Sequence, residues 1–231
     1  MMTKIMIAMD FQNQSQALDF LRPFETHPED LPILKIGMEL FYKEGADLVR
    51  QLRQKGFEIF LDLKLHDIPH TVEQAMKQIQ ALDVQFVTIH ALGGSKMVEA
   101  ARNGLGRKTH LLAVTQLTST SPEQLKSEQL VNAPLRENVV HLAEMAFRSG
   151  ADGVVSSAQE TPTIKAKVSK DCLSVTPGIR LKNTAQDDQV RITTPLEAQA
   201  LGSDYLVIGR SITQSAEPFE TYQLIKRELG A

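Results

Sequence analysis

Residues 58–90 of the chain read EIFLDLKLHDIPHTVEQAMKQIQALDVQFVTIH, and they contain the unit that repeats along the whole sequence. The two ends of this stretch, Glu58–Leu63 and Gln85–His90, are short runs rich in apolar residues, which is typical of strands buried on both faces. Between these runs, apolar residues recur at the spacing of an amphipathic helix: Val72, Met76 and Ile79. Strand, helix and strand in this order predict a parallel βαβ unit.

The same kind of apolar run recurs before and after this unit: Lys4–Met9, Ile33–Ile36, His110–Gln116, Asp152–Val155, Cys172–Thr176 and Tyr205–Gly209. Longer amphipathic stretches separate the runs, so the sequence predicts eight βα units. A (β/α)₈ barrel usually needs about 250 residues, with about 200 as a lower limit, and the chain has 231. We therefore expect an α/β fold in which residues 1–231 form a single (β/α)₈ TIM barrel without a second domain.

The main alternative is an open, doubly wound sheet of the kind that binds dinucleotides. Such sheets carry a glycine-rich turn directly after the first strand. Here the first apolar run is followed by Asp10-Phe11-Gln12-Asn13, which contains no glycine. The barrel is the better prediction.

Composition and charge indicate an ordinary soluble protein. The chain has 25 Lys and Arg against 28 Asp and Glu, a net charge of −3, which disfavours a nucleic-acid or anionic membrane surface. Its single cysteine, Cys172, cannot form an internal disulfide and is expected to be a small core residue. Neither a signal-peptide pattern nor an apolar stretch of roughly 18 residues occurs. We expect a cytoplasmic protein with no membrane or nucleic-acid partner.

Two of the gaps between strands are longer than the others. The gap from Leu111 to Gly153 is 42 residues long and holds Thr118–Pro122, an extra polar stretch and a helix predicted at Leu135–Arg148. The gap from Leu173 to Leu206 is 33 residues long and opens with Pro177-Gly178-Ile179-Arg180. Long polar loops of this kind are either lids over a site or disordered surface insertions.

The segment from Asp62 to Asp67 carries the clearest chemical signal. Residues two apart on a strand share a face, so Asp62 and Lys64 should both point into the barrel mouth while Leu63 packs against the helices. Asp67 can return from the following loop towards the same lysine, and Lys35 lies on the neighbouring strand. A lysine among carboxylates stays an ammonium, which suits a proton donor better than a Schiff-base nucleophile. The alternative is a structural ion-pair network.

A phosphate site is expected after the eighth strand. In TIM barrels the loops after strands 7 and 8 often bind phosphate through backbone N–H groups. Gly209 and Arg210 occupy this position, and Arg180 and Gln189 on the second long loop can close over the same anion. The alternative is a turn with a solvated arginine.

The histidines give no metal motif. His66 and His70 are four residues apart but separated by Pro69, so they do not form a helical metal pair, and surface or packing roles fit them better. His90 ends the fourth strand and can serve either in a structural hydrogen bond or in substrate contact. We expect no metal site.

The sequence resembles the orotidine 5′-phosphate decarboxylases of bacterial type over nearly its whole length. The resemblance is carried by these segments: Ala8–Asp10, Lys35–Phe41, Phe60–Pro69, Val114–Ser119, Thr176–Arg180 and Val207–Ser211. Its most specific element is Asp-x-Lys-x-x-Asp followed by Ile-Pro. It implies a TIM barrel that converts orotidine 5′-monophosphate to UMP, the last step of de novo UMP synthesis, without a metal or organic cofactor.

The resemblance also implies roles for particular residues. Lys64 looks like the proton donor to C6 of the pyrimidine, Asp62 lies near the substrate carboxylate, and Lys35 and Asp67 complete the charged network. In the family, the residue matching Asp67 reaches the site of the other subunit, which implies a homodimer with shared active sites. The positions that resemble substrate contacts are Asp10 and Thr71 for the ribose, Thr118 for the pyrimidine, and Gln189, Gly209 and Arg210, with Arg180 nearby, for the phosphate.

Two other functions fit parts of the pattern. Related barrels share Asp-x-Lys-x-x-Asp but act on sugar phosphates with Mg²⁺, as hexulose-phosphate synthase and keto-gulonate-phosphate decarboxylase do. Their second strand usually presents Glu where this chain has Lys35, which favours the pyrimidine substrate. A catalytically silent barrel that binds nucleotides as a sensor or scaffold is disfavoured by the complete set of Lys35, Asp62, Lys64 and Asp67.

Overall fold

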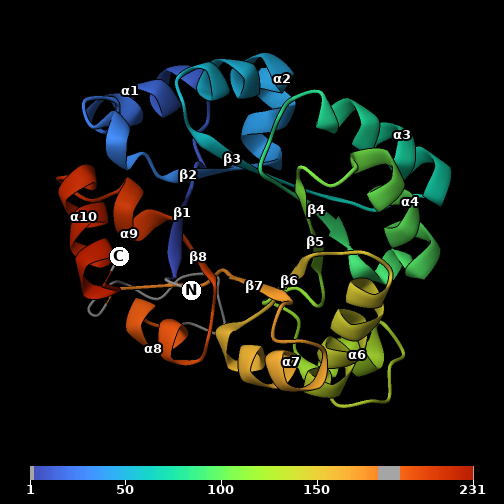
Figure 1. The fold of residues 1–231 in the computed structure, drawn as a ribbon. Coiled ribbons are helices and arrows are strands. Elements are labelled where there is room, and N and C mark those ends of the chain that lie inside the picture. The colour runs from blue at the N-terminus through green and yellow to red at the C-terminus, as the bar shows by residue number, and fades with distance from the viewer. Residues whose placement is uncertain (1–2, 182–192, 231) are drawn as a thin grey trace.

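In the computed structural model, which describes residues 3–181 and 193–230, eight parallel strands close into a barrel in the order of the sequence (Figure 1). The strands are β1 Lys4–Ala8, β2 Ile33–Gly37, β3 Glu58–Leu65, β4 Phe86–His90, β5 His110–Val114, β6 Gly153–Val155, β7 Leu173–Thr176 and β8 Tyr205–Ile208. Each predicted apolar run contains or overlaps one of them. The α/β class and the single TIM barrel are therefore confirmed, while the domain boundaries at 1 and 231 stay a prediction.

Helices form a ring outside the strands (Figure 1). They are α1 Gln14–Glu25, α2 Met38–Gln54, α3 Pro69–Gln80, α4 Ser95–Leu105, α5 Pro122–Ser127, α6 Leu135–Arg148, α7 Thr161–Lys167, α8 Pro195–Ala200, α9 Arg210–Thr213 and α10 Pro218–Glu228, with 3₁₀ turns η1 Pro28–Asp30, η2 Ala91–Gly93 and η3 Ala158–Glu160. None of the helices in the described part of the chain is long and apolar enough to cross a membrane. The cytoplasmic location itself stays a prediction of the sequence.

The sequence predicts α6 with both of its boundaries but gives only a polar stretch where α5 lies. A local capping box explains this short helix: the Ser121 side chain accepts a hydrogen bond from the backbone N–H of Gln124, whose own side chain accepts from the backbone N–H of Ser121. Pro122 occupies the first turn, where it costs no hydrogen bond, and Leu125 is buried. A helix with one buried side chain has no apolar periodicity, so the sequence pattern does not predict α5.

Side chains on β1 alternate between two apolar layers. Ile5 and Ile7 belong to the large cluster between the strands and the helices, whereas Met6 belongs to a smaller cluster that includes Phe60 and Leu112 from other strands. This period of two follows from the strand pleat. The inner layer fills the barrel, so the open space for a site is left at its ends.

Arg102 on α4 contacts the two segments that precede β5 and β6. Its Nε donates a hydrogen bond to the Gly150 carbonyl at 2.8 Å, another guanidinium nitrogen donates to the Gly106 carbonyl at 2.6 Å, and the group pairs with the Asp152 carboxylate. Burial alone would raise the pKa of Asp152, but hydrogen bonds from His110 and the Leu111 N–H, together with Arg102, lower it.

Replacing this arginine should destabilise the barrel. We expect Arg102→Met to lower the free energy of unfolding by about 2–4 kcal/mol, because partly buried carbonyls and a carboxylate lose their donor. The folded pKa of Asp152 is lowered, so its stabilisation is present above about pH 4 and is lost as the pH falls through that lowered value. Arg102→Met should therefore also flatten this acid dependence.

Urea unfolding between pH 3 and pH 7 measures both effects. Arg148→Met is the matched control, because Arg148 forms an exposed pair with Glu144 on α6 and such a pair contributes at most about 1 kcal/mol. Equal losses in the two variants would contradict the assigned role of Arg102.

Candidate active site

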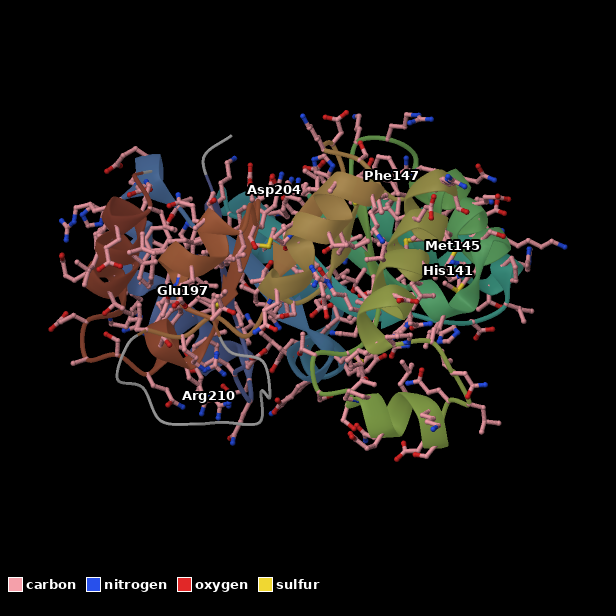
Figure 2. All side chains as sticks on the ribbon, turned by 90° about the horizontal axis from the view of Figure 1, so that it is seen from below. His141, Met145, Phe147, Glu197, Asp204 and Arg210 are labelled. Carbon is pink, nitrogen blue, oxygen red and sulfur yellow. The ribbon has the colours of Figure 1, made fainter. Side chains whose placement is uncertain are left out.

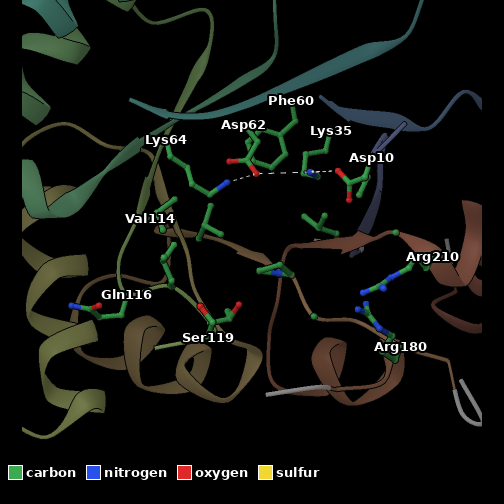
Figure 3. A pocket seen from close by; sticks show the side chains of 18 residues that line it. Asp10, Lys35, Phe60, Asp62, Lys64, Val114, Gln116, Ser119, Arg180 and Arg210 are labelled. Atoms are coloured by element: carbon green, nitrogen blue, oxygen red, sulfur yellow. Dashed lines mark hydrogen bonds and ion pairs between the residues drawn. The ribbon is translucent and has the colours of Figure 1, made fainter. Parts of the chain in front are cut away.

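A cavity of about 490 Å³ opens at the carboxyl ends of the strands, where TIM barrels place their active sites. Asp204, just before β8, and Arg210, just after it, lie at opposite ends of the molecule in the side view, and the cavity is at the Arg210 end (Figure 2). Residues from strands and following loops around the barrel line the cavity (Figure 3): Ala8, Asp10, Lys35, Phe60, Asp62, Lys64, Val114, Gln116, Leu117, Thr118, Ser119, Val155, Pro177, Gly178, Arg180, Val207, Gly209 and Arg210.

Acidic and basic side chains alternate along one wall of this cavity (Figure 3). The ammonium of Lys35 lies 3.1 Å from a carboxylate oxygen of Asp10 and 4.0 Å from one of Asp62. The Lys64 ammonium lies 2.8 Å from the same Asp62 oxygen. The side chains of Lys35 and Asp62 are each only 12% exposed, so both charges depend on these partners. The wall thus holds two cations and two anions, with Asp62 between the lysines.

The backbone of β3 is irregular where it carries this pair. Leu61 pairs with Val87 of β4, and the next paired residues are Leu65 and Ile89. Three residues of β3, 62–64, therefore lie opposite the single residue Thr88 of β4. Within this bulge Lys64 has a positive φ of 50°, a left-handed conformation that costs a residue with a side chain roughly 1–2 kcal/mol.

The bulge keeps the predicted facing of the side chains while changing the backbone that presents them. Asp62 and Lys64 line the cavity, and Leu63 between them joins the apolar cluster on the helix side. Simple strand alternation predicts this facing but not the positive φ. The bulge thus changes the direction in which the Lys64 side chain leaves the backbone, while the side chain stays on the cavity side.

Asp67 and Thr71 lie outside this cavity in the described chain. Asp67 is exposed and accepts a hydrogen bond from the neighbouring Ile68 N–H at 2.6 Å. Within the described residues, Lys64 pairs with Asp62 and no ion pair joins Asp67 to it. Thr71 is exposed in the first turn of α3. The family roles of both residues stay predictions.

The other end of the cavity carries the predicted anion-binding residues. Arg210 begins α9 directly after Gly209, and Arg180 follows β7; Figure 3 shows the two guanidinium groups beside one another. Gln189, the remaining predicted phosphate contact, lies outside the described residues, as does the polar segment Lys182–Asp188. Two arginines therefore lie at this end of the cavity, while lysines and carboxylates alternate along the first wall.

The first long loop supplies a third side of the cavity. Thr118, predicted as a pyrimidine contact, lines it together with Leu117 and Ser119. Sequence reasoning missed Gln116, which is 2% exposed and donates hydrogen bonds to Gln129 and Asn138, both at 2.9 Å. A polar residue at the end of the predicted apolar run His110–Gln116 was the signal. Through Gln116, the loop that contains α5 is tied to α6.

His90 lies beside the site but is not among the described residues that line the cavity. Its ring stacks on His66 with centroids 5.6 Å apart, and its Nδ1 accepts a hydrogen bond from the Leu92 N–H at 3.3 Å. Burial lowers the pKa of His90, and the nearby His66 and Lys64 lower it further. This geometry favours the structural role for His90. No group of three or more potential metal ligands occurs among residues 3–181 and 193–230.

Comparison with known proteins places the chain in a family. Residues 3–225 match the model of the Orotidine 5′-phosphate decarboxylase / HUMPS family. The chain belongs to this family. An orotidine 5′-phosphate decarboxylase of Oenococcus oeni is 50% identical over 224 residues, covering 97% of each chain, and one of Geobacillus kaustophilus is 47% identical over 235 residues, covering 99% of this chain and 95% of its own.

Solved structures agree with this membership. The orotidine 5′-phosphate decarboxylase of Lactobacillus acidophilus matches with a TM-score of 0.86 and 40% identity, covering 99% of this chain and 100% of its own. An uncharacterized conserved protein of Geobacillus kaustophilus matches with a TM-score of 0.87 and 42% identity, covering 97% and 99%. The resemblance to the decarboxylase family seen in the sequence is confirmed.

The lowered pKa of His90 gives a test of its environment. Below the ordinary histidine pKa of about 6.5, the unfolded chain binds a proton that the folded protein binds less well. Stability should therefore fall as the pH drops from about 6.5 through the folded pKa, and His90→Asn should remove this part of the pH dependence. Urea unfolding of both proteins between pH 5 and pH 8 checks it, with the exposed His141→Asn as control. An unchanged slope in His90→Asn would show that His90 titrates normally.

Proposed function

We propose that the chain decarboxylates orotidine 5′-monophosphate to UMP in pyrimidine biosynthesis, without a cofactor. The observation that supports this most is the Lys64–Asp62 contact at 2.8 Å on one wall of a cavity whose other end carries Arg180 and Arg210. A substrate with a ring carboxylate at one end and a phosphate at the other matches this arrangement of charges. Family membership, with relatives of that name at 50% and 47% identity, agrees with the proposal.

In the proposed reaction, the bond between C6 and the carboxylate carbon breaks and CO₂ leaves. The electron pair of that bond remains on C6, and the Lys64 ammonium stabilises the developing negative charge. Lys64 then transfers a proton to C6, which completes UMP. The ammonium is suited to this step because Asp62 holds it on the cavity wall before the substrate arrives.

Asp62 has a second role in this proposal. Its carboxylate would lie near the substrate carboxylate and repel it, and the repulsion would be relieved as CO₂ departs. Lys35 balances Asp62 from the other side at 4.0 Å and is itself paired with Asp10 at 3.1 Å. Lys35 thereby stabilises the negative charge of Asp62, whose side chain is nearly buried.

Binding energy from the remote phosphate would hold the reacting ring in place. Arg180, Arg210 and the backbone at Gly209 would hold the phosphate with the predicted help of Gln189. Thr118 would contact the pyrimidine. Asp10 would bind the ribose, while Thr71, the other predicted ribose contact, lies outside the cavity of its own chain.

The proposal extends to a homodimer in which Asp67 enters the site of the second copy. Apolar side chains are exposed directly after β2, β3 and β4, at the same end of the barrel as Asp67: Met38, Ile68 and Leu92 are 43%, 65% and 45% exposed. Neighbouring strands place these residues on one side of the mouth, where a second copy would cover them. Asp67 would then be a catalytic residue supplied by the partner.

The leading test is turnover of orotidine 5′-monophosphate in the presence of EDTA, followed by ultraviolet absorbance. We expect activity in the wild type and a loss of about 10²–10⁴-fold in kcat for Lys64→Ala, because general acid catalysis contributes on this scale. Lys77→Ala is the control, since Lys77 pairs with Glu73 on the exposed side of α3. An inactive wild type would refute the proposed function, and a fully active Lys64→Ala would remove Lys64 from the donor role.

Shared sites make a separate prediction. Lys64→Ala and Asp67→Asn should each be inactive as pure proteins, and mixing them should restore about a quarter of the wild-type activity per total site, as expected when half the dimers are mixed and hold one intact site. The measurement is activity after co-refolding, with the mixed dimers verified by differential tagging. Verified mixed dimers without activity would mean that each site is self-contained.

A further inference from the structure

Thr88 of β4 occupies the place opposite the β3 bulge. It is fully buried, and it is not among the described residues that line the cavity. Its hydroxyl donates a hydrogen bond to one carboxylate oxygen of Asp62 at 2.9 Å and accepts one from the backbone N–H of Lys64 at 2.8 Å. One side chain on the neighbouring strand therefore contacts both residues of the charged pair.

The bulge explains why the Lys64 N–H needs this partner. The regular pairing of β3 with β4 stops at Leu61 and resumes at Leu65, so the ladder carries no hydrogen bond at Lys64. Buried backbone donors require a partner, and the Thr88 hydroxyl supplies it. Lys64 also has a φ of 50°, a conformation that persists only where the surroundings hold it.

The contacts close a ring around Lys64. From the Thr88 hydroxyl, one path leads directly to the Lys64 backbone. The other leads to one oxygen of Asp62 and, through its second oxygen, to the Lys64 ammonium at 2.8 Å. The hydroxyl thus restrains the lysine at both ends, at its main chain and, through Asp62, at its charged nitrogen.

We infer that Thr88 is a positioning residue for the decarboxylation, which fixes the aim of Lys64 without touching the substrate. The inference rests on the proposed function of Lys64. The residue at this position must donate a hydrogen bond to Asp62 and accept one from the Lys64 N–H at the same time. A hydroxyl can do both, and an alkyl group can do neither. Serine keeps the function, valine keeps the shape but loses both hydrogen bonds, and cysteine makes only weak ones.

The inference is tested with Thr88→Val and Thr88→Ser in the same absorbance assay. We expect Thr88→Val to lower kcat by about 10–100-fold, because a misplacement of about 1 Å costs on this scale. KM should change by less than about threefold, since the phosphate contacts lie at the other end of the cavity. Thr88→Ser should keep kcat within about threefold of the wild type.

Thr109→Val is the matched control. Thr109 is buried just before β5, at the opposite end of the barrel, and its hydroxyl donates to the Val84 carbonyl at 2.7 Å. Both valine variants lose a buried hydroxyl, Thr88→Val with two hydrogen bonds and Thr109→Val with one. Thr88→Val should therefore lose more thermal stability, while Thr109→Val should keep kcat. Folded protein is quantified by circular dichroism, so that kcat is given per folded chain.

The outcomes separate this inference from the proposed function. An inactive wild type refutes the function. If the wild type is active and Lys64→Ala is not, a normal kcat in Thr88→Val, or an equal loss in Thr109→Val, overturns the role of Thr88. If Thr88→Val does not fold, Thr88→Cys replaces it: a reduced kcat with unchanged KM supports the inference, and a wild-type kcat overturns it.

Discussion

The pairing of β1 with β8 is the constraint on which the site depends. Lys4 to Ile7 pair in parallel register with Tyr205 to Ile208, which closes the sheet into a barrel. Closure brings Asp10, just after β1, to the same cavity as Gly209 and Arg210, about 200 residues later in the chain. Without it the lysine wall and the arginine end would belong to separate edges of an open sheet.

Closure of the barrel also brings charged side chains close together, and those on β2 and β3 are paired with charges of opposite sign. Lys35, Asp62 and Lys64 are drawn from adjacent strands β2 and β3, and each charge has an opposite neighbour within 4.0 Å. The two arginines lie beside one another at the other end of the cavity (Figure 3). Such a site can bind one anionic group of a ligand tightly and place a second group of the same ligand against a fixed ammonium.

The irregular backbone of β3 determines how Lys64 is presented to the cavity. The bulge in β3 costs ladder hydrogen bonds and places Lys64 in a left-handed conformation. Thr88 restores one of the lost hydrogen bonds and at the same time engages Asp62. A regular strand followed by a loop would present the same two side chains with far less restraint, because only the surrounding structure makes a strained backbone persist.

The sequence by itself determined the βα repeat, the barrel, the cavity-facing pair Asp62 and Lys64, and the family, because hydrophobic periodicity and a compact motif are local properties. It did not reveal α5, whose cap is local but whose apolar face is a single leucine, nor the placement of Gln116. Only the tertiary structure decided the bulge, the contact of Lys35 with Asp10, and the role of Thr88. These depend on register between strands and on closure, which join residues that no local pattern connects.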